Sequence, residues 1–200
     1  MKPAAVTGVI LAGGQSRRTG GNDKCMLRLH DKPLLLHTIE RLAPQVDDIV
    51  LCTGPHEKKY PHAGYRQITD AYNEYNGPLA GIQSAMSNCS SDYLFVTACD
   101  SPFLPVDLVN RMRKQLAATN KDVAILDDGK QRYPLPCLLK RTLRADLDRY
   151  LDSGQRKTAT WLYSYAPATL LLPELDPVFI NINTTEKLAQ AETLLRQAPN

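Results

Sequence analysis

A loop rich in glycine and basic residues follows the first apolar run of the chain. The run is Val6–Leu11, and the loop LAGGQSRRTGGNDK extends from its last residue to Lys24. Glycines let a backbone turn tightly and bring its N–H groups close to an anion, and arginines add charge-assisted donors. The loop matches neither G-x-x-x-x-G-K-[ST] nor G-x-G-x-x-G. The pattern therefore predicts a phosphate-binding loop outside the two common nucleotide-binding classes.

Basic residues in such a loop have a simpler explanation as well, because exposed cations aid solubility. Arg17, Arg18 and Lys24 are interleaved with glycines, which favours phosphate binding over this alternative. A nucleoside triphosphate carries several negative charges, and a leaving pyrophosphate needs them stabilised.

Two aspartates follow predicted strands. Asp100 comes directly after the apolar run Tyr93–Cys99, and Asp70 ends the segment that begins with the weaker run Tyr65–Thr69. A carboxylate at the carboxyl end of a strand is placed to hold Mg2+ against phosphates, and Asp70 could bind a base, a ribose or a metal. Turn or capping aspartates are common at such positions, so the residues alone leave both interpretations open.

Three further segments carry candidate binding residues. Gly77–Gly81 (GPLAG) opens a predicted helix with small residues that would admit a base or a sugar, or it only begins the helix. Arg156 and Lys157 would contact a second anionic substrate or form a solvated basic turn. Asn181 and Asn183 project to one face of a predicted strand, although Asn183 is equally explained as the N-cap of the last helix.

The elements that must position these residues alternate between strand and helix. Predicted strands cover 6–11, 48–52, 65–69 and 93–99, and predicted helices cover 33–42, 79–86 and a segment opened by Pro105. This rhythm is typical of a three-layer parallel sheet, which binds ligands outside the carboxyl ends of its strands. The second half is less regular, with strands predicted at 123–126, 133–139, 170–172 and 178–182 and helices at 143–151 and 184–197.

Composition sets the class of protein. The chain has 200 residues, 43% hydrophobic residues and a net charge of +3, which indicate one domain and neither a nucleic-acid-binding nor a membrane-spanning protein. The five cysteines lack a C-x-x-C pair, and the four histidines lack metal-ligand spacing, which argues against structural zinc. We expect reduced thiols in a cytosolic protein at every cysteine: Cys25, Cys52, Cys89, Cys99 and Cys137.

Taken together, these segments resemble the molybdenum cofactor guanylyltransferases. The first loop is similar to that family's L-A-G-G-x-[SA]-x-R-M-G pattern followed by lysine, with Thr19 in place of the methionine. Further similar segments follow in order along nearly the whole chain: Lys32-Pro33-Leu34 to G-K-P-L, Asp70 to a nucleotide-contacting aspartate, Gly77–Gly81 to G-P-L-A-G, Cys99–Pro102 to C-D-x-P, and Phe179–Thr184 to F-x-N-[IV]-N-T.

The resemblance implies a fold and a reaction. The fold is a three-layer α/β/α sandwich with a mostly parallel, Rossmann-like sheet of the nucleotide-diphospho-sugar transferase type. A single domain, residues 1–200, would bind nucleotide with its N-terminal half and pterin with its C-terminal half. The implied reaction transfers GMP from GTP to molybdenum-molybdopterin and releases pyrophosphate, with Mg2+ as cofactor. The implied protein is a cytoplasmic monomer that contacts molybdopterin-delivery proteins and apo-molybdoenzymes transiently, and no nucleic acid or membrane.

The resemblance also implies roles for individual residues. Arg18, Lys24 and Asp100 would be catalytic, with Asp100 holding Mg2+, helped by Asn181 or Asn183. The implied nucleotide-binding residues are Leu11, Ala12, Gly13, Gly14, Lys24, Cys52, Asp70, Gly77, Pro78, Leu79, Gly81 and Asp100, and the implied pterin-binding residues are Arg156, Lys157, Asn181 and Asn183. The chain departs from the family where Cys52 replaces an asparagine and where Tyr133-Pro134 replaces a His-Pro pair.

Three other functions fit these residues less well. A molybdopterin cytidylyltransferase resembles L-A-A-G and lacks G-P-L-A-G, so Gly13 and Gly77–Gly81 favour guanine; a small residue at position 13 would leave room for the purine. A sugar-1-phosphate nucleotidyltransferase usually has G-x-G-T-R, which is absent here. A non-catalytic nucleotide- or cofactor-binding carrier needs neither a metal nor leaving-group stabilisation, and the presence of Lys24 and Asp100 argues against it.

Overall fold

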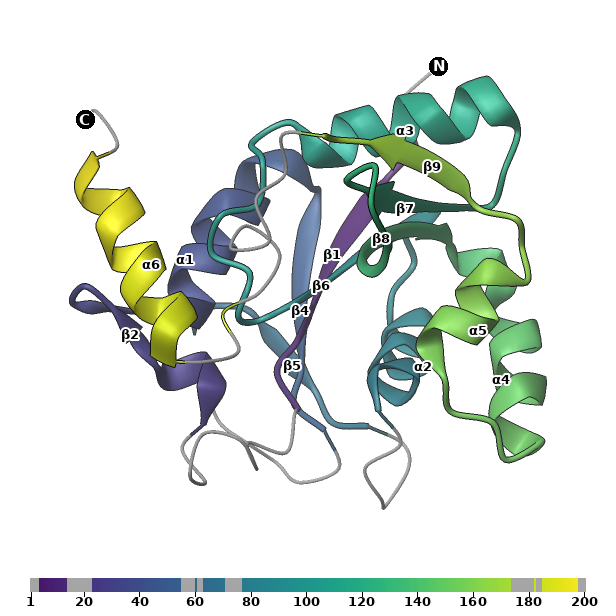
Figure 1. Ribbon diagram of the computed structural model, residues 1–200. Helices are drawn as coiled ribbons and strands as arrows, with labels where there is room; N and C mark the ends of the chain where they lie inside the picture. The colour runs from purple at the N-terminus through teal and green to yellow at the C-terminus, as the bar shows by residue number, and fades with distance from the viewer. Residues whose placement is uncertain are drawn as a thin grey trace.

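A 7-stranded sheet with the order β5-β4-β1-β6-β8-β7-β9 forms the centre of the protein (Figure 1). This computed structural model describes residues 4–13, 23–54, 60, 63–70, 77–173, 182 and 185–197. The strands of the sheet are β1 (Val6–Leu11), β4 (Asp48–Cys52), β5 (Arg66–Ile68), β6 (Tyr93–Ala98), β7 (Val123–Asp127), β8 (Arg132–Lys140) and β9 (Ala168–Leu171). Only β8 runs antiparallel to its neighbours β6 and β7 among the described strands of this sheet. The prediction of a mostly parallel sheet is confirmed.

The three central strands end level with one another. In the register of the sheet, Leu11 of β1 pairs with Cys52 of β4 on one side and with Ala98 of β6 on the other. Backbone hydrogen bonds extend the pairing past the strand ends, from Ala12 N to Cys52 O at 2.7 Å and from Cys99 N to Leu11 O at 3.1 Å. The residues that follow these strands therefore emerge side by side at the carboxyl edge of the sheet.

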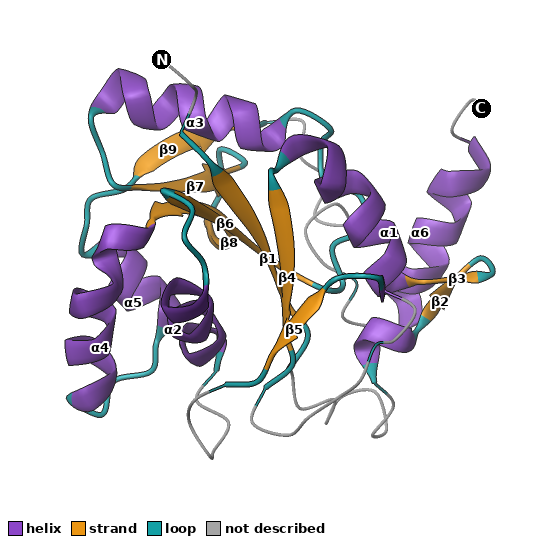
Figure 2. Cartoon of the chain, turned by 180° about the vertical axis from the view of Figure 1, so that it is seen from behind, coloured by secondary structure: helices purple, strands orange, loops and turns teal. Residues whose placement is uncertain are grey.

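Helices cover both faces of the sheet (Figures 1 and 2). Helices α1 (Leu34–Leu42) and α3 (Leu108–Thr119) pack on one face, and α2 (Pro78–Asn88), α4 (Arg144–Asp152) and α5 (Thr158–Tyr163) pack on the other. Successive strand residues point to opposite faces, so Ile10 joins the first core cluster while Val9 joins the second. The continuous apolar runs of β1 and β6 follow from this burial on both sides.

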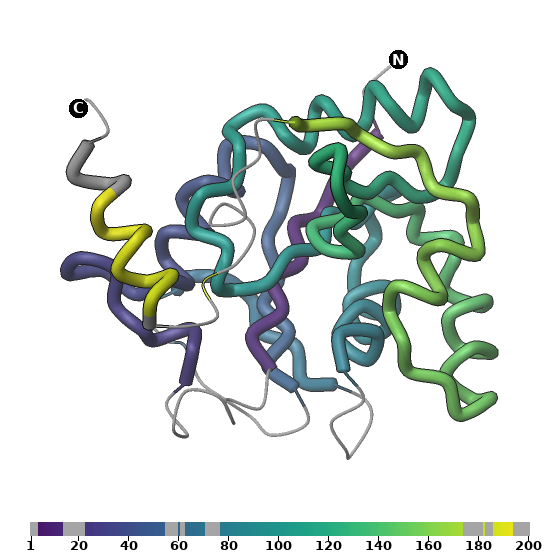
Figure 3. Tube along the Cα trace, viewed as in Figure 1, coloured from purple at the N-terminus to yellow at the C-terminus, as the bar shows by residue number. Residues whose placement is uncertain are grey.

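A small satellite core lies beside α1. The hairpin of β2 (Arg28–Leu29) and β3 (Lys32–Pro33) packs with the C-terminal helix α6 (Thr185–Gln197), although the two are far apart along the chain (Figure 3). Its buried residues are Leu29, Leu34, Phe103, Ile182 and Ala191. This core holds the chain that directly follows the short 3-10 turn η2 (Lys24–Met26), which ends the phosphate-loop segment.

Several boundaries differ from the sequence prediction. The helix expected to open at Pro105 begins at Leu108, because the Pro105 carbonyl accepts a bond from Leu108 N (3.2 Å) and forms a turn before the helix. Helix α5 and the β2–β3 hairpin were not predicted, since elements this short show no usable periodicity. The strand predicted at 178–182 lies outside the described residues except for Ile182. Among the described helices, none is long and apolar enough to span a membrane.

Candidate active site

The described ends of the predicted phosphate-binding loop are Leu11–Gly13 and Asp23–Lys24. Gly14, Arg17 and Arg18 lie outside the described residues. At Gly13, a Cβ atom would lie 2.4 Å from Gly54 N and 2.5 Å from Gly54 Cα, far inside contact distance. Gly54 itself has φ +81°, a conformation that favours glycine. Glycine is required at position 13 because the connections leaving β1 and β4 cross there backbone to backbone.

Tyr60 ties the two ends of this loop together. Its hydroxyl lies 2.7 Å from Asp23 Oδ2 and 3.3 Å from the Ala12 carbonyl oxygen, and its side chain is buried. The other carboxylate oxygen of Asp23 accepts a hydrogen bond from Cys25 N (3.1 Å) and so caps the turn that carries Lys24. The sequence did not single out Tyr60 or Asp23, because Tyr60 stands in a connection with no motif and meets its partners only in the fold.

Lys24 and Asp100 form an ion pair at the carboxyl edge of the sheet. Lys24 Nζ lies 3.8 Å from Asp100 Oδ2, and the Asp100 side chain is 8% exposed. Burial raises the pKa of Asp100, and the positive charge of Lys24 opposes that shift. In the described part of the chain, Asp100 Oδ1 is buried and has no hydrogen-bond partner. A buried oxygen without a partner is costly, so this atom is suited to receive a cation or a donor from a substrate.

The residues around Asp100 fit a hard divalent cation. Mg2+ is usually held by one or two carboxylates, with waters and substrate phosphates filling its other positions. No group of three or more His, Cys, Asp or Glu side chains is placed to hold a metal within the described residues. Asn181 and Asn183 lie outside that part of the chain, but Ile182 between them donates its N–H to the Asp100 carbonyl at 2.8 Å. Ile182 is therefore attached directly next to Asp100.

The N-terminal part of α2 packs against the carboxyl ends of β1 and β4 at Gly81. A Cβ at Gly81 would lie 2.7 Å from Leu11 Cδ2, 3.3 Å from Cys52 Cβ and 3.6 Å from Asp70 Oδ1, so four candidate residues converge at Gly81. The Cys52 thiol donates to the Gly81 carbonyl (3.2 Å) and is 1% exposed, and burial raises the pKa of this thiol. Cys52 thus links β4 to α2, and its contact with a nucleotide stays a prediction.

Asp70 presents a second unpartnered carboxylate oxygen. Its Oδ1 is buried without a hydrogen-bond partner among the described residues, and burial raises the pKa of Asp70 to about 6. Its backbone N–H donates to Gly54 O (3.0 Å), which links Asp70 to the crossing at Gly13. Helix α2 begins directly after Gly77, whose φ of +71° favours glycine, and Pro78 and Leu79 lie in its first turn. Asp70 and the start of α2 therefore face one region.

Comparisons with known proteins agree with this geometry. The family described as "MobA-like NTP transferase domain" matches residues 8–169. A molybdenum cofactor guanylyltransferase of Shewanella halifaxensis is 41% identical over 187 residues, covering 94% of this chain and 94% of that protein. Another from Shewanella piezotolerans is 40% identical over 195 residues, covering 98% and 96%. This chain belongs to the molybdenum cofactor guanylyltransferase family.

Solved structures confirm the fold of this family member. A molybdopterin-guanine dinucleotide biosynthesis protein A from Archaeoglobus fulgidus superposes with a TM-score of 0.78 at 24% identity, covering 96% of this chain and 100% of that chain. A 2-C-methyl-D-erythritol 4-phosphate cytidylyltransferase from Thermus thermophilus has a TM-score of 0.68 at 16% identity, covering 94% and 98%. The predicted nucleotide-diphospho-sugar transferase fold and the assignment to the nucleotidyltransferases are both confirmed.

Arg156 and Lys157, the candidate pterin-binding residues of this guanylyltransferase family member that the structure describes, differ in how free their charges are to bind a substrate. Arg156 Nη1 donates to the carbonyl oxygens of Leu151 (2.6 Å) and Gln155 (2.7 Å), so its guanidinium caps the end of α4. Lys157 is exposed, and its backbone begins α5. The α4–α5 connection lies at the same end of the molecule as the start of α2 (Figures 1 and 2). The location fits a second substrate, and Lys157 presents the more accessible charge.

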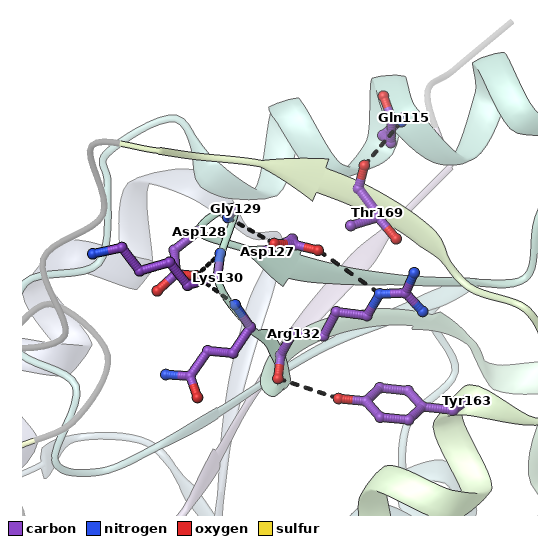
Figure 4. Close-up of polar contacts among 9 residues, drawn as sticks. Gln115, Asp127, Asp128, Gly129, Lys130, Arg132, Tyr163 and Thr169 are labelled. Carbon is purple, nitrogen blue, oxygen red and sulfur yellow. Dashed lines mark hydrogen bonds and ion pairs between the residues drawn. The ribbon is translucent and has the colours of Figure 1, made fainter.

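The β7–β8 hairpin carries the Tyr133-Pro134 departure from the family pattern, and its polar groups bind one another (Figure 4). Asp127 Oδ1 accepts from Gly129 N (2.7 Å), and Asp128 Oδ1 accepts from Lys130 N and Gln131 N, both at 2.8 Å. The Tyr133 hydroxyl donates to Asp128 Oδ2 (2.7 Å). Tyr133 therefore stabilises the hairpin at the edge of the sheet.

The expectation of reduced thiols throughout is wrong for one pair. Cys25 and Cys99 are joined by a disulfide, with Cα atoms 5.4 Å apart and a sequence separation of 74. Sequence spacing gives no sign of it, because only the fold brings the η2 turn against the end of β6. Cys52, Cys89 and Cys137 are free and buried, in agreement with the expectation for these three.

Proposed function

We propose that this protein transfers the GMP moiety of GTP to molybdenum-molybdopterin and releases pyrophosphate. The terminal phosphate of the pterin would attack the α-phosphorus of GTP. The observation that carries the proposal is the Lys24–Asp100 pair beside the unpartnered Asp100 Oδ1, at the edge where the phosphate-binding loop leaves β1. A triphosphate needs both a cation and a metal-binding carboxylate there, and the names of the relatives supply the identity of the two substrates.

The chain's own residues supply positioning and charge. Lys24, held by the capped η2 turn, would neutralise charge on the leaving pyrophosphate. Asp100 would hold Mg2+ through Oδ1, with Asn181 or Asn183 beside it. When bound, Mg2+ would draw the phosphate oxygens into one geometry and offset the charge that develops as pyrophosphate leaves. No covalent nucleophile from the protein is required, because in-line transfer depends mainly on positioning and charge neutralisation.

Guanosine and pterin would occupy opposite parts of the edge. Leu11–Gly13, Asp70 and the start of α2 form the nucleotide side, where the Asp70 carboxylate would accept hydrogen bonds from guanosine. Lys157, with the α4–α5 connection, would attract the anionic pterin phosphate. Arg18 and Gly14 keep their proposed roles in triphosphate binding. We also propose that residues 1–200 act as one nucleotidyltransferase domain, as a cytoplasmic monomer that receives and delivers its pterin through transient protein contacts.

Pyrophosphate release tests this function. The purified protein, molybdenum-molybdopterin and Mg2+ are incubated with each of the four nucleoside triphosphates. We expect release with GTP alone; release with CTP but not GTP would establish the cytidylyltransferase, and no release with any of them would favour a carrier.

A paired substitution tests the role of Asp100. Asp100→Asn should lower kcat by about 10²-fold or more, the scale on which charge-stabilising groups act, and should abolish the dependence of GTP affinity on Mg2+. Asp122→Asn is the matched control, because Asp122 forms a 2.6 Å pair with Lys140 at the opposite edge of the sheet. Near-normal kcat in Asp100→Asn would refute the metal role.

A further inference from the structure

The disulfide joins the two segments that carry the charged pair of the proposed site. Cys25 directly follows Lys24, and Cys99 directly precedes Asp100. The ion pair between Lys24 and Asp100 therefore lies one residue away from the covalent link on each segment. The 5.4 Å between the Cα atoms is within the range that a disulfide requires.

The two sides of the link are held very differently. Cys99 is held by β1 and α1, because its N–H donates to Leu11 O (3.1 Å) and its carbonyl accepts from Thr38 Oγ1 (3.0 Å). The Asp100 carbonyl accepts from Ile182 N (2.8 Å). Cys25 stands in η2, a 3-10 turn of 3 residues that belongs to no sheet and is held by the Asp23 cap and by the bond of Tyr60 to Asp23. The disulfide therefore connects a short turn to a rigid strand end, and Lys24 is on the turn.

Breaking the link changes the space that the sulfurs need. Unbonded sulfur atoms cannot approach as closely as bonded ones, and Cys25 and Cys99 are only 1% and 6% exposed. In this closely packed region the two thiols separate either by rotation of a cysteine side chain or by a shift of the turn, and both change the packing that supports Lys24. The turn itself reaches the surface, since the next residue, Met26, is 50% exposed. A small opening of the turn would give a reagent access to the pair.

We propose that Cys25 and Cys99 are a reversible thiol–disulfide modification site, and that their bond positions Lys24 against Asp100 for nucleotidyl transfer. The oxidised form is the competent one. The proposal rests on the function proposed above. Oxidation requires a small-molecule disulfide: one cysteine attacks it and releases one thiol, and the second cysteine attacks the mixed disulfide and releases the other. Two cysteine protons are lost, the protein is oxidised by two electrons, and the external disulfide is reduced by two.

The test uses the wild-type protein in two states, prepared with oxidised glutathione or with a phosphine reductant. Alkylation after denaturation should label three cysteines in the first state and all five in the second, and peptide mapping should recover the 25–99 link. Because misplacement by about 1 Å costs up to ~10²-fold in rate, we expect reduction to lower kcat about tenfold and GTP affinity severalfold. The KM for molybdopterin and the circular dichroism spectrum should stay the same.

Variants separate this effect from a general loss of structure. Cys25→Ser should have the low kcat of the reduced protein in both states, and Cys89→Ser, a buried free cysteine outside the site, should respond to the reductant like the wild type. Equal kcat and equal GTP affinity in the two states, a higher kcat on reduction, or no 25–99 link under oxidant would each overturn the proposal. If GTP is not turned over in either state, the proposed function fails, and the GTP affinities alone decide the role of the pair.

Discussion

Replacing Gly13 by alanine separates two explanations of this glycine. The family resemblance implies that a small residue here leaves room for a purine, whereas the structure shows that position 13 packs on the backbone of Gly54. The added methyl would lie 2.4 Å from Gly54 N and 2.9 Å from Thr53 C. Real Cβ contacts are not shorter than about 3.0 Å, so one connection must move by more than half an ångström. Backbone, unlike a flexible side chain, cannot give way locally.

The magnitude follows from this overlap. Overpacking costs about 1–3 kcal/mol, and a chain of this size loses about 2–4 °C of Tm per kcal/mol, so Gly13→Ala should lower Tm by roughly 2–12 °C. The displaced Gly54 accepts the Asp70 N–H (3.0 Å) and would carry Asp70 with it. We therefore expect kcat/KM for GTP to fall about tenfold or more, the scale of an ångström-sized misplacement.

Thermal unfolding and steady-state pyrophosphate release measure the two effects. Gly64→Ala is the control, because Gly64 has φ +72° and a Cβ there would meet no atom within 4 Å. Left-handed strain of about 1–2 kcal/mol should lower its Tm comparably without changing the kinetics. If Gly13→Ala kept the wild-type Tm and only changed the preference between GTP and CTP, the packing argument would be refuted and the purine-room explanation supported.

Two further predictions concern Asp70 and Tyr60. Burial raises the folded-state pKa of Asp70 from 3.8 to about 6, so the fold loses stability as pH rises from about 4 to 6 and stays less stable above pH 6. Asp70→Asn should therefore raise Tm at pH 8, and the gain in Tm should shrink as pH falls from 6 towards 4. A gain that is independent of pH would contradict this assignment. Tyr60→Phe keeps the buried ring but removes the bond to Asp23, worth about 1.5 kcal/mol or more, so kcat/KM for GTP should fall about tenfold; unchanged kinetics would show that Tyr60 does not position Lys24.

Local patterns predicted the edge of the sheet on which the candidate site lies. Continuous apolar runs identified β1 and β6 as buried strands, so the loop after Leu11 and Asp100 were both expected at the ligand-binding edge. The parallel pairing of β1 with β6 brings them together there. The register that places Leu11 beside Cys52 and Ala98 is a finding of the structure, because strand ranges alone do not fix which residues pair.

Contacts made only by the folded chain could not be predicted. Tyr60 reaches Asp23 across 37 positions and Cys25 reaches Cys99 across 74, and neither pair has a local motif. The prediction that position 13 needs a small residue agrees with the structure, but the reason is different. The small residue is needed because the connections leaving β1 and β4 cross there, which a sequence does not show. Arg156 and Lys157 read alike in the sequence, yet only the fold shows that the guanidinium of Arg156 caps α4.

Hydrogen-bond partners separate turn aspartates from ligand-binding aspartates, a distinction that strand positions in the sequence do not make. Asp70, Asp100, Asp127 and Asp128 all stand at the carboxyl edge of the sheet, where turn aspartates and ligand-binding aspartates are both common. Asp127 and Asp128 accept bonds from the backbone of their own hairpin, and hydrogen bonds from Tyr133 and that backbone lower the pKa of Asp128. These two are turn aspartates.

Asp70 and Asp100 differ from these turn aspartates in their hydrogen bonding and in the direction of their pKa shifts. Each has one buried oxygen without a hydrogen-bond partner among the described residues, and burial raises the pKa of each. Burying an ionised carboxylate with an unpartnered oxygen opposes folding, so ionisation of either side chain destabilises the fold. Their desolvation is relieved when a cation or a hydrogen-bond donor arrives from outside the chain. A guanylyltransferase supplies both, because its nucleotide brings donors on the base and ribose and a metal on the phosphates.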